Sequence, residues 1–339
     1  MYPFYLGVDL HLKNSYLVLL DQSGKRVDDR HLRTSELVAY VKDHVPRETC
    51  AVLEATRNWA YFYDELSALV AEVKLAHPKE LKAISSAAVK TDRIDATVLA
   101  HLARMNYLPV AYAAPKDVRD LRQYTRHREE LVNLRTQAKN RVHAVFAQYQ
   151  IAYPKSDLFG KGGREFLDAY LDKVRPSAKY VLRNQLALID RLDELIKETV
   201  LAQRKALNTE QKQIHRLLMS IPGIGAIHAA TILAEIGEIE RFQKSKSLCN
   251  WAGLTPRIRN SDQVIRHGRI SKQGSPHLRA AMTQAAAVAS YRNKYWKNVH
   301  DKLVPRCSKK GAKVAIARRL LTVVFYVWKR REIYREPSV

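Results

Sequence analysis

The N-terminal part of the chain alternates between short apolar runs and polar turns. Residues 4–10 (FYLGVDL) and 15–21 (SYLVLLD) have the length and composition of β-strands, and the turn residues Gln22-Ser23-Gly24 follow the second run. Residues 25–33 can then pair back as a third strand. The pattern therefore predicts a three-stranded antiparallel meander.

After residue 33 the spacing switches between helical and strand-like. Helices are predicted over 36–45 and 59–72, and short buried strands over 50–55 and 73–77. Because strand-helix-strand crossovers make the later strands parallel, the sheet should be mixed. This order of elements is that of the ribonuclease-H-like (RuvC-like) fold, so we expect an α/β domain over residues 1–113 with its site at strand carboxyl ends.

Beyond Pro115 the pattern becomes that of long, charged helices with apolar residues three and four positions apart. The predicted helices are 116–150 and 177–206, with a loop between them that contains Gly160, Gly162, Gly163 and Pro176. We interpret residues 114–206 as a helical coiled-coil spacer. Such a hairpin is suited to pairing with a second protomer.

The last part of the chain, residues 207–339, is predicted to be a mainly α-helical domain. Its segment IPGIG (221–225) precedes an apolar helical pattern and resembles a helix-hairpin-helix turn. In such a turn Gly223 and Gly225 let backbone amides approach a phosphate. The alternative is a tight turn between two helices with no ligand.

The net charge of the chain indicates the class of molecule that it binds. The chain has 58 lysines and arginines against 34 acids, a formal net charge of +24. An excess this large favours nucleic acid over an anionic membrane, although a solvated basic surface is the simpler alternative. The apolar run 320–328 is too short to span a bilayer, and the first residues do not resemble a signal peptide. Three widely spaced cysteines fit a reducing compartment, so we expect a cytoplasmic protein.

Four acids of this basic chain fall where the predicted sheet would have its site. Asp9 lies in the first strand, Glu54 ends the strand AVLE, and Asp92 and Asp95 share one helical face about a turn apart. Carboxylates that converge repel one another unless cations lie between them, and Mg²⁺ prefers such oxygen ligands. The alternative for the helical pair is a first turn that is capped by Thr91 and stabilised by the helix dipole. Asp9 argues for the metal, because an acid amid apolar strand residues is costly to bury alone.

A second candidate site lies in the basic segment 257–279, where Ser261 is the candidate nucleophile. Guanidinium groups around a serine would stabilise charge on an attacked phosphate, which would permit a phosphoserine link to DNA. The alternative is a loop serine in a phosphate-binding patch, and Ser271 and Ser275 compete for the same role. The basic residues concerned are Arg257, Arg259, Arg266, Arg269, Lys272 and Arg279.

Taken in order, several segments resemble the transposases of insertion-sequence family one-hundred-and-ten. They are GVDLHLKNSYLVLLD, EATRNWAY, KTDRIDATVLA, IPGIGAIHAATILAEIG, WAGLTP and GRISKQGSPHLR, and together they extend over most of the chain. The resemblance implies a DEDD-type recombinase with a RuvC-like domain, a coiled coil and a serine-bearing transposase domain. It also implies recombination of a mobile element's DNA ends with a target, guided by an element-encoded noncoding RNA.

The same resemblance implies roles for individual residues. The acidic tetrad would be Asp9, Glu54, Asp92 and Asp95 with bound Mg²⁺, and the nucleophile would be Ser261, in a dimer or tetramer whose protomers share the site. Two positions differ from the usual family pattern, since Arg57 and Asp262 stand where glycine is common. Two other functions compete with this one: a hydrolytic RuvC-like nuclease without a covalent intermediate, and a non-catalytic nucleic-acid scaffold.

Overall fold

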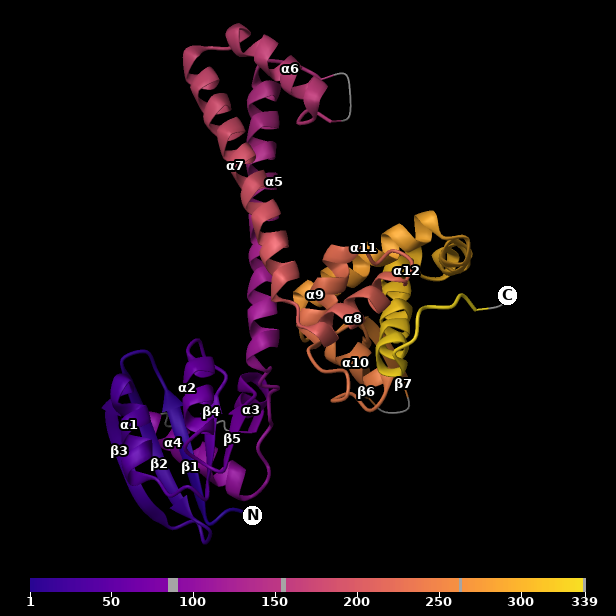
Figure 1. The fold of residues 1–339 in the computed structure, drawn as a ribbon. Helices are drawn as coiled ribbons and strands as arrows, with labels where there is room; N and C mark the ends of the chain where they lie inside the picture. Colours follow the sequence, from indigo (N-terminus) through magenta and orange to yellow (C-terminus); the bar gives the residue numbers. More distant parts are fainter. Residues whose placement is uncertain (85–90, 154–156, 262–263, 338–339) are drawn as a thin grey trace. The chain divides into compact units, whose positions relative to one another are not determined.

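The computed structural model describes residues 1–84, 91–153, 157–261 and 264–337, with the side chains of residues 83 and 258–267 left out. The chain divides into two compact units, residues 1–113 and residues 114–339 (Figure 1). Each unit is described by itself below. None of the helices in the described ranges combines the length and the apolar character needed to cross a membrane.

The first unit is built on a five-stranded sheet with the strand order β3-β2-β1-β4-β5. β1 lies at its centre, pairs antiparallel with β2 and parallel with β4, and β4 continues parallel to β5. The sheet is therefore mixed, as the sequence predicts. The strands are β1 (Phe4–Leu10), β2 (Asn14–Asp21), β3 (Arg26–Arg33), β4 (Thr49–Glu54) and β5 (Glu72–Ala76).

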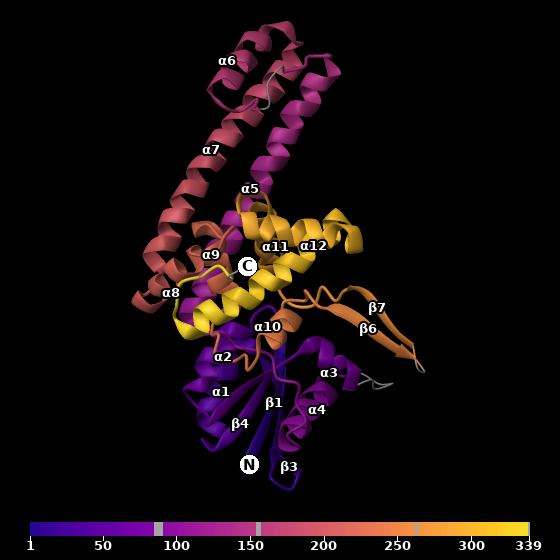
Figure 2. The same cartoon turned by 90° about the vertical axis from the view of Figure 1, so that its right-hand side faces the viewer.

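Helices cover both faces of this sheet (Figure 2), so the side chains of its central strand are buried on both sides. One face carries Leu6, Val8 and Leu10 against α1 and α2, and the other carries Tyr5 against α3 and α4. The elements are the 3₁₀ turn Thr34–Glu36, α1 (Leu37–His44), α2 (Trp59–Ser67), α3 (Pro78–Ile84) and α4 (Asp92–Arg104).

One boundary of this unit differs from the prediction. The helix expected over 59–72 ends at Ser67, because the chain turns at Ala68 and enters β5 at Glu72. The apolar residues that continue the helical spacing, Leu69 and Val70, pack against the core from the connection instead. Because β5 runs parallel to β4, the connection must carry the chain back to the end of the sheet at which β4 begins.

The second unit begins with two long helices that lie side by side in opposite directions (Figures 1 and 2). Leu131 near the middle of the first helix packs with Leu192 and Ile196, whereas Phe146 near its end packs with Leu182. The helices are α5 (Lys116–Gln148) and α7 (Pro176–Ala206).

The loop predicted between these helices is wrong. Residues Lys161–Tyr170 form the helix α6, followed by a short 3₁₀ turn Leu171–Lys173, and Pro176 occupies the first turn of α7. Gly162 and Gly163 lie inside α6, since the burial of Leu167 and the rings around Phe166 outweigh the glycines' unfavourable helix propensity.

The remaining residues form a mainly helical body around one large apolar core. Its mainly α-helical character agrees with the prediction, with one two-stranded sheet inserted between α10 and α11. The elements are α8 (Thr209–Met219), α9 (Ala226–Ile236), α10 (Ser245–Trp251), β6 (Pro256–Ser261), β7 (Val264–Ile270), α11 (Pro276–Arg292) and α12 (Lys294–Arg330). The segment that sequence analysis describes as a serine loop is therefore largely a β-hairpin.

Candidate active site

The site in the first unit depends on a close contact between α4 and β1. Gly7 lies on the same face of β1 as Asp9, two residues earlier. A Cβ at Gly7 would lie 1.9 Å from the Ala96 carbonyl oxygen and 2.8 Å from the Ala100 nitrogen. The helix backbone therefore rests directly on the strand, and the small residues Ala96 and Ala100 are fully buried there.

The start of α4 has the capped geometry that sequence analysis considers as an alternative. The Thr91 side chain accepts a hydrogen bond from the Ile94 nitrogen at 3.3 Å, and Asp92 and Asp95 occupy the first turn. The negative charges of both acids thus interact favourably with the helix dipole. This local role does not compete with a second one, because a helix that starts at Asp92 and packs on Gly7 also carries these acids toward Asp9.

Asp9, His11 and Asp92 form a cluster whose ligand atoms all lie within 4.8 Å of one another. The His11 Nε2 atom is 3.2 Å from Asp9 Oδ2 and 3.7 Å from Asp92 Oδ1. Asp9 is buried, whereas His11 and Asp92 are exposed. The cluster therefore has a buried carboxylate at its base and two exposed ligands at its mouth.

Burial makes the charge on Asp9 unfavourable. Asp9 is 6% exposed, and this desolvation is the main reason that its pKa is raised. The negative charges of Asp92 and Asp95 raise the pKa of Asp9 further, while His11 lowers it. A cation placed among these oxygens would remove both the desolvation cost and the repulsion.

The other two predicted acids lie beside this cluster. Val8 of β1 pairs with Leu53 of β4 in a parallel register. The next residue on each strand is Asp9 and Glu54, so these two acids lie side by side on neighbouring strands. Asp95 is close enough to Asp9 for its charge to raise the Asp9 pKa. Among the described side chains, the group with ligand atoms within 4.8 Å comprises Asp9, His11 and Asp92, without Glu54 or Asp95.

His11 is the residue that sequence analysis missed. It follows β1, and its carbonyl oxygen accepts hydrogen bonds from Thr34 Oγ1 at 2.9 Å and from Asn58 Nδ2 at 3.3 Å. These contacts hold the backbone from which the imidazole reaches Asp9. The signal was the D-x-H spacing at the end of a buried strand, which places both side chains on one face.

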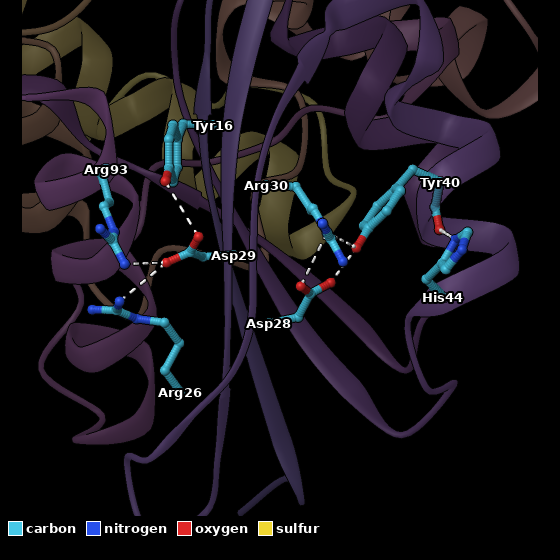
Figure 3. Close-up of polar contacts among 8 residues, drawn as sticks. All are labelled: Tyr16, Arg26, Asp28, Asp29, Arg30, Tyr40, His44 and Arg93. Atoms are coloured by element: carbon cyan, nitrogen blue, oxygen red, sulfur yellow. Dashed lines mark hydrogen bonds and ion pairs between the residues drawn. The ribbon is translucent and has the colours of Figure 1, made fainter.

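A polar network beside the cluster fixes the first turn of α4 to β3 (Figure 3). Arg93 Nη2 lies 2.5 Å from Asp29 Oδ2, and Arg26 Nη1 lies 3.0 Å from the same oxygen. Tyr16, which pairs with Asp9 in the sheet, donates to the other oxygen of Asp29 at 3.4 Å. Asp29 thus connects the strand beside Asp9 with the residue that follows Asp92.

In the second unit, the two glycines of the IPGIG turn have different environments. Gly223 has a φ of +85°, and a Cβ there would lie 2.2 Å from the Ala285 carbonyl oxygen, so close packing on α11 requires glycine. Gly225 precedes α9 directly, and a Cβ there would meet nothing within 4 Å. Packing against α11 explains why position 223 is glycine, whereas no neighbouring atom requires glycine at position 225.

Ser261 ends β6 opposite Val264 in the hairpin register. Arg259 and Arg266 pair with each other across the same hairpin, so these three residues share a short two-stranded segment. Their side chains, like Asp262 as a whole, lie outside the description. Arg269 is exposed at the far end of β7.

The base of this hairpin is held by the other predicted basic residues. Arg279 Nη1 donates to the carbonyl oxygens of Ala252, Gln273 and Gly274 at 3.1, 2.8 and 3.0 Å. Arg257 Nη2 donates to the Ser271 carbonyl oxygen at 3.1 Å, and the Lys272 nitrogen donates to the Gly253 carbonyl. The structure thus gives Arg279 an internal role that its place in the sequence did not indicate.

The two competing serines have local partners. Ser275 caps α11 by accepting a hydrogen bond from the Leu278 nitrogen at 3.1 Å, and it also bonds to the buried Glu235. Ser271 Oγ accepts a hydrogen bond from the Gln273 nitrogen at 3.4 Å. Both side chains therefore contribute to the turn that follows β7.

Comparison with known proteins extends these observations to both units. The family model for DEDD-type IS110 transposases, described as Transposase, matches residues 6–151. A second model, described as Transposase IS116/IS110/IS902 family, matches residues 215–301. The chain belongs to the IS110 family of DEDD transposases.

Individual relatives of this transposase family agree with that assignment. The transposase for insertion sequence element IS1111A of Coxiella burnetii is 25% identical over 97% of this chain and 91% of its own length. A probable family 20 transposase of Pseudomonas aeruginosa is 26% identical over 83% of this chain and 82% of its own. The pilin gene-inverting protein of Moraxella bovis is 33% identical over 36% of this chain and 39% of its own. The DEDD match contains the acid cluster, and the second match contains the β6–β7 hairpin.

Proposed function

We propose that this transposase cuts and rejoins the DNA of a mobile element, with the acid site of the first unit and Ser261 of the second unit as its two reactive parts. The family assignment makes the chain an enzyme that acts on DNA, which speaks against the non-catalytic scaffold. The observation that carries the proposal is the Asp9–His11–Asp92 cluster, in which a buried carboxylate lies among ligand atoms within 4.8 Å.

The residues of the cluster fit a divalent metal. Asp9 and Asp92 offer the hard oxygen ligands that Mg²⁺ prefers. Burial, together with the charges of Asp92 and Asp95, raises the pKa of Asp9, and a cation bound there would favour its charged form. We propose Asp9, Asp92, Glu54 and Asp95 as the residues that hold Mg²⁺, with His11 at the edge of the site. The ion, when bound, supplies positive charge to phosphate oxygens during phosphoryl transfer.

The proposed role of Ser261 is that of a nucleophile. Its Oγ would form a bond to a DNA phosphorus while the bond from that phosphorus to the leaving deoxyribose oxygen breaks. The Ser261 hydroxyl loses its proton, and the leaving oxygen gains one. Arg257 and Arg269, which lie in the two strands of the hairpin, would stabilise the charge on the phosphate. Rejoining reverses the step with a different DNA hydroxyl.

Partners follow from the family resemblance and the charge. We propose DNA of the element ends and the target as substrate, an element-encoded noncoding RNA as guide, and a homo-oligomer, a dimer or tetramer, as the active form in the bacterial cytoplasm. The Moraxella relatives are named for gene inversion, which is a recombination between two DNA sites. That name supports cutting followed by rejoining.

The test is a denaturing gel of end-labelled element DNA incubated with the protein, Mg²⁺ and the RNA of the element's flanks. The native chain should give a covalent protein–DNA adduct that Ser261→Ala lacks and Asp92→Asn reduces by about 100-fold or more. Cut DNA with no adduct from either the native or the Ser261→Ala protein would favour the hydrolytic nuclease instead. Full strand exchange by both variants would overturn the proposal.

A further inference from the structure

The positive charge of the second unit is not evenly compensated. On the helices α5, α6 and α7, arginines are paired with acids, as in Arg135 with Asp193 and Arg164 with Asp190. Arg191 likewise lies 2.8 Å from Glu194. Such pairs offset part of the positive charge of these helices, because each of them places an acid beside an arginine.

A run of basic residues with a single acid near it lies at a break in α12. The backbone leaves helical geometry at Cys307 and Ser308, two residues after Pro305. The half after the break packs into the core through Ile316, Ala317 and later residues. Ser308 Oγ accepts a hydrogen bond from the Gly311 nitrogen at 3.3 Å, which caps this second half.

Five basic side chains surround the break, and all of them are exposed. None of the five has a carboxylate partner among the described residues. Asp301 is the one acidic residue between Arg292 and Arg319, and His300 Nδ1 lies 3.1 Å from it. We call this the kink surface, and its members are Lys302, Arg306, Lys309, Lys310 and Lys313.

The chemistry of the kink surface selects its partner. Like charges this close together repel one another, and a chain of phosphates relieves that repulsion at several positions at once. A membrane-surface helix would also need large apolar side chains beside the charges. Between Lys294 and Lys313 the described residues include no exposed large hydrophobic side chain.

We propose that the kink surface binds the phosphodiester backbone of a nucleic acid, as a second binding surface besides the β6–β7 hairpin. The proposal rests on the proposed function only in that the chain acts on DNA. Phosphate contacts fix position rather than sequence. The surface would therefore hold either duplex DNA or folded RNA in place without reading its bases.

The test measures the dissociation constant of the full-length protein as a function of salt concentration. The probes are a short labelled duplex DNA and a labelled hairpin RNA, without Mg²⁺. The variant is Lys309→Gln, Lys310→Gln and Lys313→Gln together. The matched control removes the same charge from exposed lysines elsewhere in the unit, through Lys197→Gln, Lys205→Gln and Lys212→Gln.

The kink variant should bind at least one probe about tenfold or more weakly at low salt, and its log–log salt slope should fall by about 2 to 3, since each contacted phosphate contributes about 0.9. The probe that loses affinity identifies DNA or RNA as the ligand. Equal slopes for the kink variant and the control on both probes would overturn the proposal.

Asp92→Asn separates this inference from the proposed function. It should bind both probes as the native chain does, because the acid cluster takes no part in the kink surface. If Asp92→Asn still cuts DNA while the kink variant loses binding, the proposed function fails and the kink surface stands.

Discussion

The acid site and the serine hairpin are held in place by different kinds of contact. Asp9 lies on the central strand of a five-stranded sheet, with the backbone of α4 directly against the same face. Ser261 lies on a sheet of two strands, whose base is held by hydrogen bonds from Arg279 to three carbonyls. A two-stranded hairpin is only marginally stable alone.

One proposed half of the enzyme is therefore positioned by steric packing and the other by a few polar contacts. The acid site should therefore lose its geometry when a side chain is added between β1 and α4. The hairpin should lose its position when hydrogen-bond donors at its base are removed. This difference can be measured with single substitutions, because each site has one residue on which its geometry mainly depends.

The largest effect is expected from Gly7→Ala. The added methyl group would lie 1.9 Å from the Ala96 carbonyl oxygen, so α4 must move away from β1 at a cost of about 3 kcal/mol in unfolding free energy. Mg²⁺-dependent cutting should be lost with it. Thermal unfolding and a cleavage assay check both.

The matched control is Gly162→Ala. Its added Cβ would have only Tyr153 Oη in contact, at 3.9 Å, inside the helix α6. Replacing a glycine in the first turn of this helix limits the freedom of the unfolded chain and should raise stability by up to about 1 kcal/mol. A Gly7→Ala protein that melts and cuts like the native chain would contradict the packing account of the acid site.

The next effect is expected from Arg279→Ala, which removes a donor shared by three carbonyls at the hairpin base. Its expected cost is about 2 kcal/mol, since hydrogen bonds from charged groups are worth more than neutral ones. The serine adduct should disappear, while stabilisation by Mg²⁺ should remain. Arg257→Ala removes one such bond and should cost about 1 kcal/mol. An unchanged yield of adduct in Arg279→Ala would contradict this account.

A smaller effect of opposite sign is expected from Asp9→Asn. The folded chain holds the Asp9 proton to a higher pH than the unfolded chain does, because the Asp9 pKa is raised. Stability from this group is therefore lost as pH rises from the ordinary aspartate pKa through the raised one, and the ionised group costs stability at neutral pH. In metal-free buffer Asp9→Asn should therefore melt at a higher temperature than the native chain at pH 7.

The same variant should no longer gain stability from Mg²⁺, whereas the native chain should gain about 1–2 kcal/mol at Mg²⁺ concentrations well above the dissociation constant. At a pH below the ordinary aspartate pKa the two proteins should melt alike in the absence of metal. Scanning calorimetry at both pH values gives the comparison. A lower melting temperature for Asp9→Asn than for the native chain at neutral pH would contradict the conclusion that burying the Asp9 charge costs stability.

The smallest effect is expected from Arg93→Ala. Its ion pair with Asp29 lies 2.5 Å from atom to atom, but half of the Arg93 side chain is exposed. Pairs of this kind contribute less than about 1 kcal/mol and weaken in high salt. The drop in unfolding free energy should shrink as salt is added. A loss that is large and independent of salt would show that the Asp29 network does more than hold the first turn of α4.

Much of the first unit could be predicted from the sequence because its central strands are short apolar runs separated by polar turns. The mixed sheet, the strand carrying Asp9 and the capped start of α4 at Asp92 all follow from local pattern and crossover rules. His11 could not be found in the same way, because a search for carboxylates passes over a histidine two residues away. Only the geometry places its Nε2 between two acids.

The second unit was harder to predict for two physical reasons. Glycines indicated a loop where the burial of Leu167 and stacking of Phe166 on Tyr170 stabilise α6. Arg279 has the composition of a phosphate ligand, but its partners are backbone carbonyls brought together by the turns at Gly253 and Gly274. Such contacts depend on tertiary structure, which periodicity does not contain.

The contact at Gly7 also bears on how this protein can change over evolutionary time. The spacing between strand and helix at that point is set by main-chain atoms, which every substitution elsewhere leaves in place. Side chains on the opposite face, such as Leu6 and Val8, pack in a different apolar cluster and take no part in the contact between Gly7 and α4. Mutational drift in that half of the core should alter how long the protein survives in the cell before it alters the chemistry it performs.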